Sequence, residues 1–416
     1  MEDTRIIDIK DRIKAELTGE SLADGGWDEE EIAGYIDAAL MTYPEYIPIK
    51  VKKDIRKCIM NEIIGYDVIS ELLENDDITD IMVNGESDIF YERNGKIHRY
   101  GKCFSSSAKL FDIIQHIAAG HNRIVNESEP IVDVRLKDGS RVNIVLPPVA
   151  INGPVVTIRK FPKHDFTLEK LTEIGSITKE AADFLKRLVH ARYNIFISGG
   201  TGTGKTTFLN ALSNYIPSDE RIVTIEDSAE LRMQGIENIV SLETRNANFE
   251  GNNEITMRDL IKSSLRMRPD RIIVGEVRGE ETLDMLQAMN TGMEGSLSTG
   301  HSNSATDMLN RIETMVLMGM DMPVQAIRSQ IGSAIDIIVH LGRLRDKSRR
   351  VLQIVEVTGY KDGEIALNPL YRFEETGEQD GRVCGRLVKC GCMTNTDKFI
   401  AAGVRDWGQT ENCMRE

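Results

Sequence analysis

Apolar side chains in the first part of the chain follow a helical spacing. Between residues 1 and 75 they recur every three or four positions, which predicts helices over Ile7–Ala15, Glu29–Ala39 and Ile55–Ile64. The pair Gly25-Gly26 interrupts the pattern between the first two of these helices. We therefore expect the chain to begin with a helical segment.

The pattern changes to short β-type runs between residues 76 and 160. The dipeptides Asn84-Gly85 and Asn94-Gly95 separate the first of these runs and are typical of tight turns between strands. A helix is expected over Ser107–Ala119, because serines at its start can cap the free N–H groups. Further strand-like runs lie at Ile131–Leu136, Arg141–Leu146 and Pro154–Arg159. The sequence thus predicts a small mixed α/β N-terminal domain.

A proline marks the end of this region. Pro162 forbids helix and disfavours a central strand, so residues 161–166 are expected to form a linker. Beyond it, over 167–350, helical segments alternate with strand-like runs at 194–198, 222–226, 238–242 and 271–275. This alternation is typical of a doubly wound parallel sheet.

The last region, 351–416, is expected to hold one β pair and a polar tail without an assigned role. The pair comprises Val351–Gly359 and Glu364–Tyr371. The tail contains Cys384, Cys390 and Cys392, with a C-x5-C-x-C spacing and no C-x-x-C pair. That spacing favours free thiols over a zinc site.

One segment has the residues of a nucleotide-phosphate binding loop. It reads Gly199-Gly200-Thr201-Gly202-Thr203-Gly204-Lys205-Thr206-Thr207, after an apolar run and before a helical stretch. Glycines let the backbone N–H groups turn toward phosphate oxygens, and the following helix N-terminus adds a favourable dipole. In this pattern the lysine reaches the β- and γ-phosphates and the hydroxyl binds Mg²⁺. We predict that residues 199–207 bind ATP, with Lys205 on the phosphates and Thr206 on Mg²⁺.

The strand-like run at 222–226 ends in a cluster of carboxylates, Glu226, Asp227 and Glu230. In open α/β sheets, functional residues gather at the carboxyl ends of strands. We expect Glu226 and Asp227 to share in holding Mg²⁺ and Glu230 to take part in catalysis. Solvated acids that only cap the strand are the structural alternative.

The run at 271–275 delivers another carboxylate, Glu276, to the same edge of the predicted sheet. A carboxylate there can order water for in-line attack or hold a metal-bound water. The usual second phosphate-side motif ends this strand in Asp, and here Gly275 takes that place. We expect Glu276 to be the general base.

A histidine follows a further β-type run. His301 lies between Gly300 and Ser302. A lone histidine is more often structural than catalytic, but an imidazole changes charge near neutral pH and can respond to a nearby phosphate. Because His301 follows a strand-like run, we expect it beside the γ-phosphate.

The balance of charge bears on the partners of this protein. The 416 residues carry 66 acidic and 51 basic side chains, for a formal net charge of −15. Proteins that bind duplex nucleic acid usually carry a basic balance, so nucleic acid is disfavoured as the main partner. The most basic run, 343–350, is interpreted as a solvated loop or helix end.

The compartment is suggested by the absence of targeting features. No apolar stretch approaches the roughly 18 residues of a membrane-spanning helix. The start, Met1–Arg5, carries charge and lacks the apolar core of a signal peptide. We expect a cytoplasmic protein, in which the six cysteines would be reduced thiols.

Several of these motifs occur in an order that resembles one ATPase superfamily. They are Gly199–Thr207, Ile225–Leu231 (Ile-Glu-Asp-x-x-Glu-Leu), Arg266–Arg271 with Gly275–Arg278, and Thr299–His301. As a set they resemble the signature boxes of the type II/type IV secretion ATPases. Leu242–Arg245 and Asp80–Gly85 narrow the resemblance to the CpaF-like branch, which drives assembly of tight-adherence (Flp-type) pili.

The resemblance implies an α/β fold, in which a RecA-like P-loop NTPase motor domain follows a helical segment and a small mixed α/β N-terminal domain. It also implies a homo-hexameric ring that docks on inner-membrane platform proteins, so that the membrane is met only through partners. Glu276 matches the family's essential glutamate, and His301 matches its His-box histidine. Arg135, Arg141 and Arg159 lie where the family supplies phosphate-contacting arginines.

Two other functions remain open at this point. A DNA-translocating RecA-fold ATPase would share the nucleotide motifs, but the acidic balance and the lack of an aromatic and basic single-strand track argue against it. A nucleotide-responsive structural ring without significant hydrolysis would not need Lys205, Thr206 and Glu276 together. Extension, retraction and export use the same motifs, so the direction of work stays open.

Overall fold

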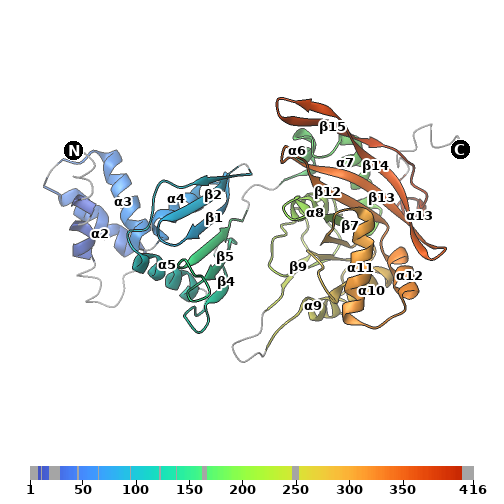
Figure 1. The fold of residues 1–416 in the computed structure, drawn as a ribbon, viewed down its shortest axis with the longest axis horizontal. Coiled ribbons are helices and arrows are strands. Elements are labelled where there is room, and N and C mark those ends of the chain that lie inside the picture. The colour runs from blue at the N-terminus through green and yellow to red at the C-terminus, as the bar shows by residue number, and fades with distance from the viewer. Residues whose placement is uncertain are drawn as a thin grey trace. The chain divides into compact units, whose positions relative to one another are not determined.

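The computed structural model divides the chain into an N-terminal unit, Met1–Lys163, and a C-terminal unit, His164–Glu416 (Figure 1). It describes residues 8–10, 12–17, 29–44, 46–63, 65–93, 95–120, 123–136, 138–161, 166–245 and 253–404. Predictions that fall outside the described residues concern Ile7, the Gly25-Gly26 break, Asn94 and Pro162 with residues 163–165 of the linker.

The N-terminal unit begins with helices that share a small apolar core. The described residues between 8 and 17 are helical, and α2 (Glu29–Thr42) and α3 (Ile49–Ile63) follow. Ile36 and Ile59 are fully buried in this core. Both lie at positions of the three-to-four spacing, so the helical prediction is confirmed for these residues.

A six-stranded antiparallel sheet forms the rest of this unit, in the order β3-β2-β1-β6-β5-β4. The strands are β1 (Ile78–Asn84), β2 (Asp88–Arg93), β3 (Lys96–Arg99), β4 (Ile131–Arg135), β5 (Arg141–Val145) and β6 (Val155–Arg159), preceded by η1 (Asp67–Ile69) and α4 (Ser70–Glu74). Gly85 has a φ of +75° and makes the predicted turn between β1 and β2. The side chain of Ser106 caps α5 (Ser107–Ala119) by accepting from the Lys109 N–H, as predicted.

The C-terminal unit contains a nine-stranded sheet in the order β15-β14-β13-β12-β7-β11-β10-β8-β9. Neighbours from β12 to β9 are parallel, and the pairs from β12 to β15 are antiparallel. The parallel strands are β7 (Ile195–Gly199), β8 (Ile222–Glu226), β9 (Ile239–Glu243), β10 (Arg271–Val274), β11 (Leu297–His301) and β12 (Ile337–Arg343). The sequence pattern predicted all of these except β12.

Helices cover both faces of this sheet. They are α6 (Leu168–Glu173), α7 (Lys179–His190), α8 (Lys205–Ser213), α9 (Met257–Ser264), α10 (Glu281–Asn290), α11 (Ala305–Gly319) and α12 (Val324–Ala334). Along β7, Ile195 and Ile197 belong to the core formed with α7 and α8, whereas Phe196 belongs to the core formed with α10, α11 and α12. The unit therefore has the doubly wound, RecA-like α/β fold that was predicted. None of the described helices is long and apolar enough to cross a membrane.

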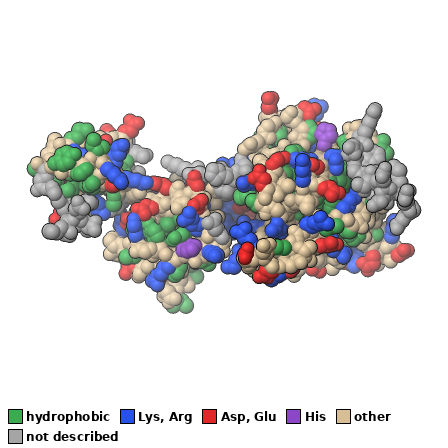
Figure 2. Space-filling model, turned by 90° about the horizontal axis from the view of Figure 1, so that it is seen from above, with side chains coloured by type: hydrophobic (Ala, Val, Ile, Leu, Met, Phe, Trp, Pro, Cys, Tyr) green, Lys and Arg blue, Asp and Glu red, His purple; other side chains and the backbone are tan. Residues whose placement is uncertain are grey.

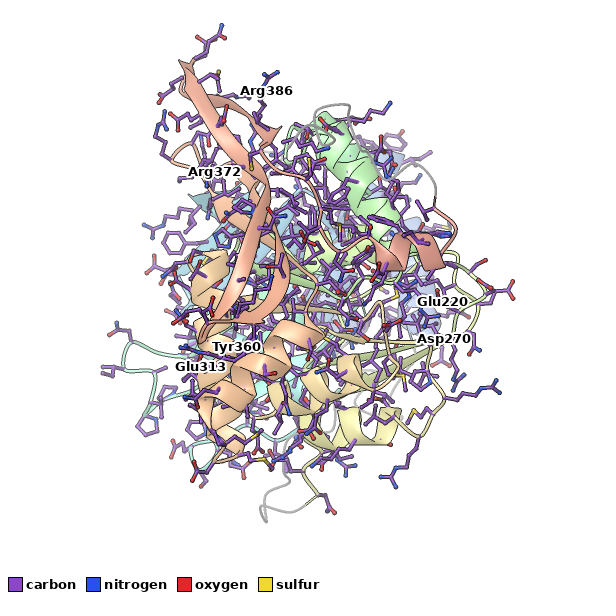
Figure 3. The ribbon with its side chains drawn as sticks, turned by 90° about the vertical axis from the view of Figure 1, so that its right-hand side faces the viewer. Glu220, Asp270, Glu313, Tyr360, Arg372 and Arg386 are labelled. Atoms are coloured by element: carbon purple, nitrogen blue, oxygen red, sulfur yellow. The ribbon has the colours of Figure 1, made fainter. Side chains whose placement is uncertain are left out.

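The C-terminal region differs from the expected β pair and unassigned tail. Three antiparallel strands, β13 (Arg349–Lys361), β14 (Glu364–Gln379) and β15 (Arg382–Lys389), extend the same sheet, and Figure 3 shows Arg372 and Arg386 on this ribbon. The tail then forms α13 (Asp397–Ala401). Strand β15 was missed because its two buried residues, Val383 and Leu387, are four positions apart and give no alternating apolar pattern.

The tail is held to the sheet by buried groups. Phe399 is fully buried, and its ring centroid lies 4.9 Å from that of Tyr193. The Glu356 carboxylate, 1% exposed, accepts hydrogen bonds from the backbone N–H groups of Thr394 and Asn395. These residues give the tail a structural role, which its polar composition concealed.

The cysteine prediction holds in part. Cys384 and Cys390 are free thiols, but Cys392 is disulfide-bonded, which corrects the expectation for that residue. Among the described residues no group of three His, Cys, Asp or Glu side chains could hold a metal ion, so the zinc alternative gains no support there.

Candidate active site

The glycine-rich loop lies between β7 and α8. Gly202 and Gly204 have φ values of +70° and +92°, which residues other than glycine rarely adopt. A Cβ on Gly199 would lie 2.5 Å from the carbonyl oxygen of Leu341, so this position has no room for a side chain. Backbone conformation and close packing therefore both require the glycines of the motif.

Backbone donors without intramolecular partners line this loop. Among the described residues, no N–H group from Thr201 to Lys205 donates to a backbone carbonyl, and α8 has no side-chain cap at its N-terminus. The side chains of Thr203 and Lys205 both donate to the carbonyl of Gly200, at 2.9 and 3.1 Å. Free N–H groups at a helix N-terminus bind phosphate. We refer to residues 199–207 as the phosphate cradle.

Lys205 is nearly buried at the start of α8, with 7% of the residue exposed. Burial lowers the pKa of its ammonium group, and the Glu276 carboxylate acts in the opposite direction. Its Nζ lies 3.1 Å from Nδ1 of His301. Because an ammonium group can only donate, Nδ1 is the acceptor and the ring proton of neutral His301 lies on Nε2.

His301 links Lys205 to Glu276. Its Nε2 lies 2.9 Å from Oε1 of Glu276. Burial lowers the pKa of His301; the Glu276 carboxylate raises it, and Lys205 lowers it further. The result is a neutral imidazole between an ammonium group and a carboxylate, a geometry that can respond to a change at either side.

The strand order explains why these residues meet. Strands β7, β11 and β10 are parallel neighbours, with Gly199 paired to His301 and Ile273 paired to Leu297. Parallel neighbours end at the same edge of a sheet, so the cradle, His301 and the segment after β10 converge there. The structure thus brings three of the predicted site residues, Lys205, His301 and Glu276, into one chain of contacts.

Arg278 also belongs to this chain, although it was not among the predicted site residues. Its Nη2 donates to Oε2 of Glu276 at 2.9 Å, and its Nη1 lies 3.5 Å from Oδ2 of Asp227. The hydrogen bond to Glu276 is the main cause that raises the pKa of Arg278, and Asp227 and Glu230 add to it. The signal in the sequence was a cation two positions beyond the predicted base.

Glu226 has a different environment from that expected of a metal ligand. It is 4% exposed, and its Oε1 accepts hydrogen bonds from the backbone N–H groups of Glu230 and Leu231. A Cβ on Gly275 would lie 2.9 Å from Cγ of Glu226, so glycine at this position leaves room for the carboxylate. Glu226 therefore shapes the loop that carries Asp227 and Glu230.

The oxygen donors fit a magnesium ion that is held mainly by phosphate. Mg²⁺ commonly keeps water and phosphate ligands and takes only one or two from protein. Thr206 lies in the first turn of α8, and Asp227 follows β8. Glu226 accepts backbone hydrogen bonds, and Oδ1 of Asp227 accepts one from the Thr244 hydroxyl at 2.9 Å. Thr206 and the more exposed Asp227 remain the predicted donors for this ion.

A cavity of about 480 Å³ opens beside the cradle. Its lining comes from the cradle, the turn after β11 and the first half of α11, and comprises Gly200, Thr201, His301, Ser302, Asn303, Asp307, Asn310, Arg311 and Thr314. Because His301 is part of this wall, a molecule in the cavity would contact the residue that links Lys205 to Glu276.

Arg141 and Arg159 belong to the N-terminal unit. They are direct partners on β5 and β6, and Arg135 is the partner of Arg141 on β4. Arg159 forms an exposed ion pair with Asp80, with Nε 3.4 Å from Oδ1. The three arginines therefore form one row across the sheet.

Most of the chain is similar to proteins of conjugal transfer and secretion systems. Residues 64–393 match the family described as type II/IV secretion system protein. A putative conjugal transfer protein of Mycobacterium tuberculosis is 35% identical over 340 residues, covering 80% of this chain and 96% of the relative. The type IV secretion system protein VirB11 of Brucella abortus is 33% identical over 296 residues, covering 65% of this chain and 82% of that protein.

The fold is also found in a solved structure of the pilus retraction motor PilT with bound ADP. That structure has a TM-score of 0.52 and 18% identity, and covers 81% of this chain and 86% of its own. At this identity the likeness concerns the fold alone. The family match covers most of the chain, and the phosphate cradle agrees with it. The chain therefore belongs to the type II/IV secretion system protein family and is an ATPase of the secretion ATPase superfamily.

Proposed function

We propose that this chain is a CpaF-like motor that hydrolyses ATP to drive assembly of tight-adherence pili or related protein secretion. The contact chain from Lys205 through His301 to Glu276 at the phosphate cradle is the observation that carries the catalytic part. The choice of the CpaF-like branch rests on Leu242–Arg245 and Asp80–Gly85.

In this proposal the cradle N–H groups and Lys205 bind the phosphates of ATP. Thr206 and Asp227 would hold Mg²⁺, which would neutralise phosphate charge when bound. Glu276 accepts the proton of the attacking water, and Glu230 assists from the neighbouring loop. Arg278 donates a hydrogen bond to Oε2 of Glu276 at 2.9 Å, and Nε2 of His301 lies 2.9 Å from Oε1.

His301 is proposed to report on the γ-phosphate. Lys205 now donates to Nδ1 of His301, 3.1 Å away. When Lys205 turns to a phosphate, His301 loses that donor while its Nε2 still faces Glu276. The state of the nucleotide thereby alters the surroundings of the base.

The active form is proposed to be a homo-hexameric ring in the cytoplasm, docked on inner-membrane platform proteins of the pilus or secretion system. The proposed division is 1–75, 76–160, 161–166, 167–350 and 351–416, with β13–β15 of the last segment extending the sheet of the one before it. Arg141 and Arg159 of the N-terminal domain would complete the site within the ring by neutralising charge on the γ-phosphate.

The test of the nucleotide site is Lys205→Ala, assayed by phosphate release and by nucleotide binding. Turnover should fall at least about a hundredfold, because an electrostatic contact to the transferring group is lost. Lys262→Ala is the control, since Lys262 is an exposed lysine on α9 with 49% of its side chain accessible. Near wild-type turnover in Lys205→Ala would overturn the assignment.

Conjugal transfer is the second candidate process, because relatives of this chain carry that name. On the face of the C-terminal unit visible in Figure 2, Lys and Arg side chains are interspersed with Asp and Glu, which does not favour a DNA-binding track. Genes for a prepilin, a prepilin peptidase and platform proteins beside this one would support pilus assembly. DNA-stimulated ATP turnover would support a DNA-translocating motor instead.

A further inference from the structure

The basic run 343–350 lies against the phosphate cradle. It forms the turn from β12 into β13, and Arg349 is the first residue of β13. Nε of Arg349 donates to the carbonyl oxygen of Gly202 at 2.9 Å. Its Cδ would lie 3.6 Å from a Cβ on Gly204. One arginine thus reaches both glycines whose left-handed backbone shapes the cradle.

The position of Arg349 is fixed from the side opposite the cradle. Its own carbonyl accepts a hydrogen bond from the Ser176 hydroxyl at 2.8 Å. In the same turn, the Asp346 carboxylate accepts from the Ser348 N–H at 2.9 Å and from the Val383 N–H of β15 at 2.9 Å. These bonds tie the turn to the sheet, so the guanidinium group is presented to the cradle by a supported backbone.

The contact between Arg349 and the Gly202 carbonyl affects the inner surface of the cradle through the Gly202–Thr203 peptide. The bond between Gly202 and Thr203 is trans, so the Thr203 N–H points away from the Gly202 carbonyl. Arg349 holds that carbonyl on the outside, which leaves the N–H directed to the phosphate side. A charge-assisted hydrogen bond fixes the peptide orientation and polarises the N–H. In loops of this type these N–H groups bind the α- and β-phosphates.

We propose that Arg349 is a positioning residue of the nucleotide site, which sets the Gly202–Thr203 peptide for binding a nucleoside di- or triphosphate. This inference rests on the proposed function, because it takes residues 199–207 as the nucleotide site. We assign the Thr203 N–H to the β-phosphate and not to the α-phosphate, so Arg349 acts on the β-phosphate through the backbone. Affinity for ATP and ADP therefore depends on it, whereas affinity for AMP does not.

The side chain offers a matched pair of substitutions. In Arg349→Gln the amide nitrogen occupies the same place along the side chain as Nε, so the donor is kept while the charge is lost. Arg349→Met removes the donor. The control is Arg343→Met, which removes a charge from the same turn: Arg343 is the strand partner of Arg349, and its Nε donates instead to the Lys347 carbonyl at 3.4 Å.

The experiment measures dissociation constants on the full-length chain with a fluorescent ADP, displaced by ATP, ADP or AMP. We expect Arg349→Met to weaken ATP and ADP about three- to tenfold, with AMP unchanged and kcat within about twofold. Arg349→Gln should recover most of the affinity, and Arg343→Met should match the wild type. Equal loss in the Gln and Met variants, in Arg343→Met, or for AMP would overturn the proposal.

Lys205→Ala separates this inference from the proposed nucleotide site. If Lys205→Ala binds the fluorescent ADP and hydrolyses ATP like the wild type, the site itself is wrong. If Lys205→Ala is impaired and Arg349→Met binds normally, the site stands and only the role of Arg349 is overturned.

Discussion

Nζ of Lys205 and Nδ1 of His301 lie 3.1 Å apart, although 96 positions separate them in the chain. They meet because β7 and β11 are parallel neighbours that end at the same edge of the sheet. His301 in turn contacts Glu276 at 2.9 Å. The lysine proposed to bind phosphate and the carboxylate proposed to order water are therefore joined by one imidazole.

The two glutamates at the sheet edge are expected to differ in their effect on turnover. Glu276→Gln keeps the shape of the side chain but removes the base, so ATP should still bind while turnover falls about a hundredfold or more. Glu230→Gln should slow turnover less and alter its dependence on Mg²⁺. The measurements are kcat and the dissociation constant for ATP, each over a magnesium titration.

One outcome would move the role of general base from Glu276 to Glu230. If Glu276→Gln stayed fully active while Glu230→Gln was dead, the base would lie in the loop after β8. Glu281→Gln serves as a control for the loss of a nearby carboxylate, because Glu281 accepts the N–H of Arg278 at 2.6 Å without contacting Glu276.

A pH dependence is expected from His301. Burial holds its pKa below the usual 6.5, so the neutral form that accepts from Lys205 persists at pH 6.5 and above and is lost only as the pH falls through that lowered pKa. His301→Gln cannot gain this proton. The ratio of wild-type to His301→Gln turnover should therefore be largest at pH 6.5 and above and shrink as the pH falls through the lowered pKa of His301. A ratio that stayed constant from pH 8 down to the lowest pH at which the chain stays folded would contradict the role of the neutral ring.

The lowered pKa of His301 also makes folding stability depend on pH. The direction follows from which state, folded or unfolded, binds more protons. Because the pKa of His301 is lower in the folded state, the unfolded chain binds more protons between that pKa and 6.5. The contribution of neutral His301 is thus present above pH 6.5 and is lost as the pH falls through the window below it. Thermal unfolding of the wild type and His301→Gln, compared at pH 7.5 and 5.5, should show a smaller decrease in Tm for the variant.

The sequence was informative wherever local pattern and function coincide. The glycines of residues 199–207 and the apolar run of β7 are local features, and they were sufficient to predict the cradle. The alternation of helical and strand-like segments over 167–350 predicted the doubly wound sheet. Glu276 and His301 could be placed at one edge because each follows a strand-like run. Such inferences need only the rule that parallel strands end together.

Contacts that depend on strand register could not be predicted in this way. Glu226 was expected to bind metal, but the close approach of Gly275 makes room for its carboxylate to accept backbone bonds instead. The contact of Arg349 with Gly202 requires β12 beside β7, and β12 was missed. The tail was also missed, because a few buried residues rather than a repeating pattern hold it.

Stability should depend on the tail through Phe399. This side chain is fully buried against Tyr193, and truncating a buried phenylalanine costs about 3–5 kcal/mol. Phe399→Ala should therefore lower the Tm of the C-terminal unit substantially. Ile400→Ala on the same helix is the control, because Ile400 is 62% exposed. Equal unfolding temperatures for the two variants would contradict the anchoring role of the tail.

The arginine row of the N-terminal unit leads to the last prediction. Arg159 is 63% exposed in its side chain and pairs with Asp80 at 3.4 Å. Exposed ion pairs of this kind add about 0–1 kcal/mol, so Arg159 can exchange Asp80 for a phosphate at little cost. If Arg159 only pairs with Asp80, removing either residue should have the same effect on turnover. If Arg159 contacts phosphate in the ring, only its own removal should lower turnover.

Turnover per subunit is expected to rise with protein concentration as the proposed ring forms, because arginines of the N-terminal domain are proposed to complete the site. Arg159→Ala and Arg141→Ala should assemble and bind ATP but hydrolyse it slowly, by as much as about 10³-fold. Asp80→Asn is the matched control, since it breaks the pair with Arg159 yet keeps the guanidinium group. It should preserve turnover if Arg159 acts on phosphate, whereas a purely structural pair would make Asp80→Asn and Arg159→Ala alike. Activity that is independent of concentration, with both arginine variants unimpaired, would exclude a site completed within the ring.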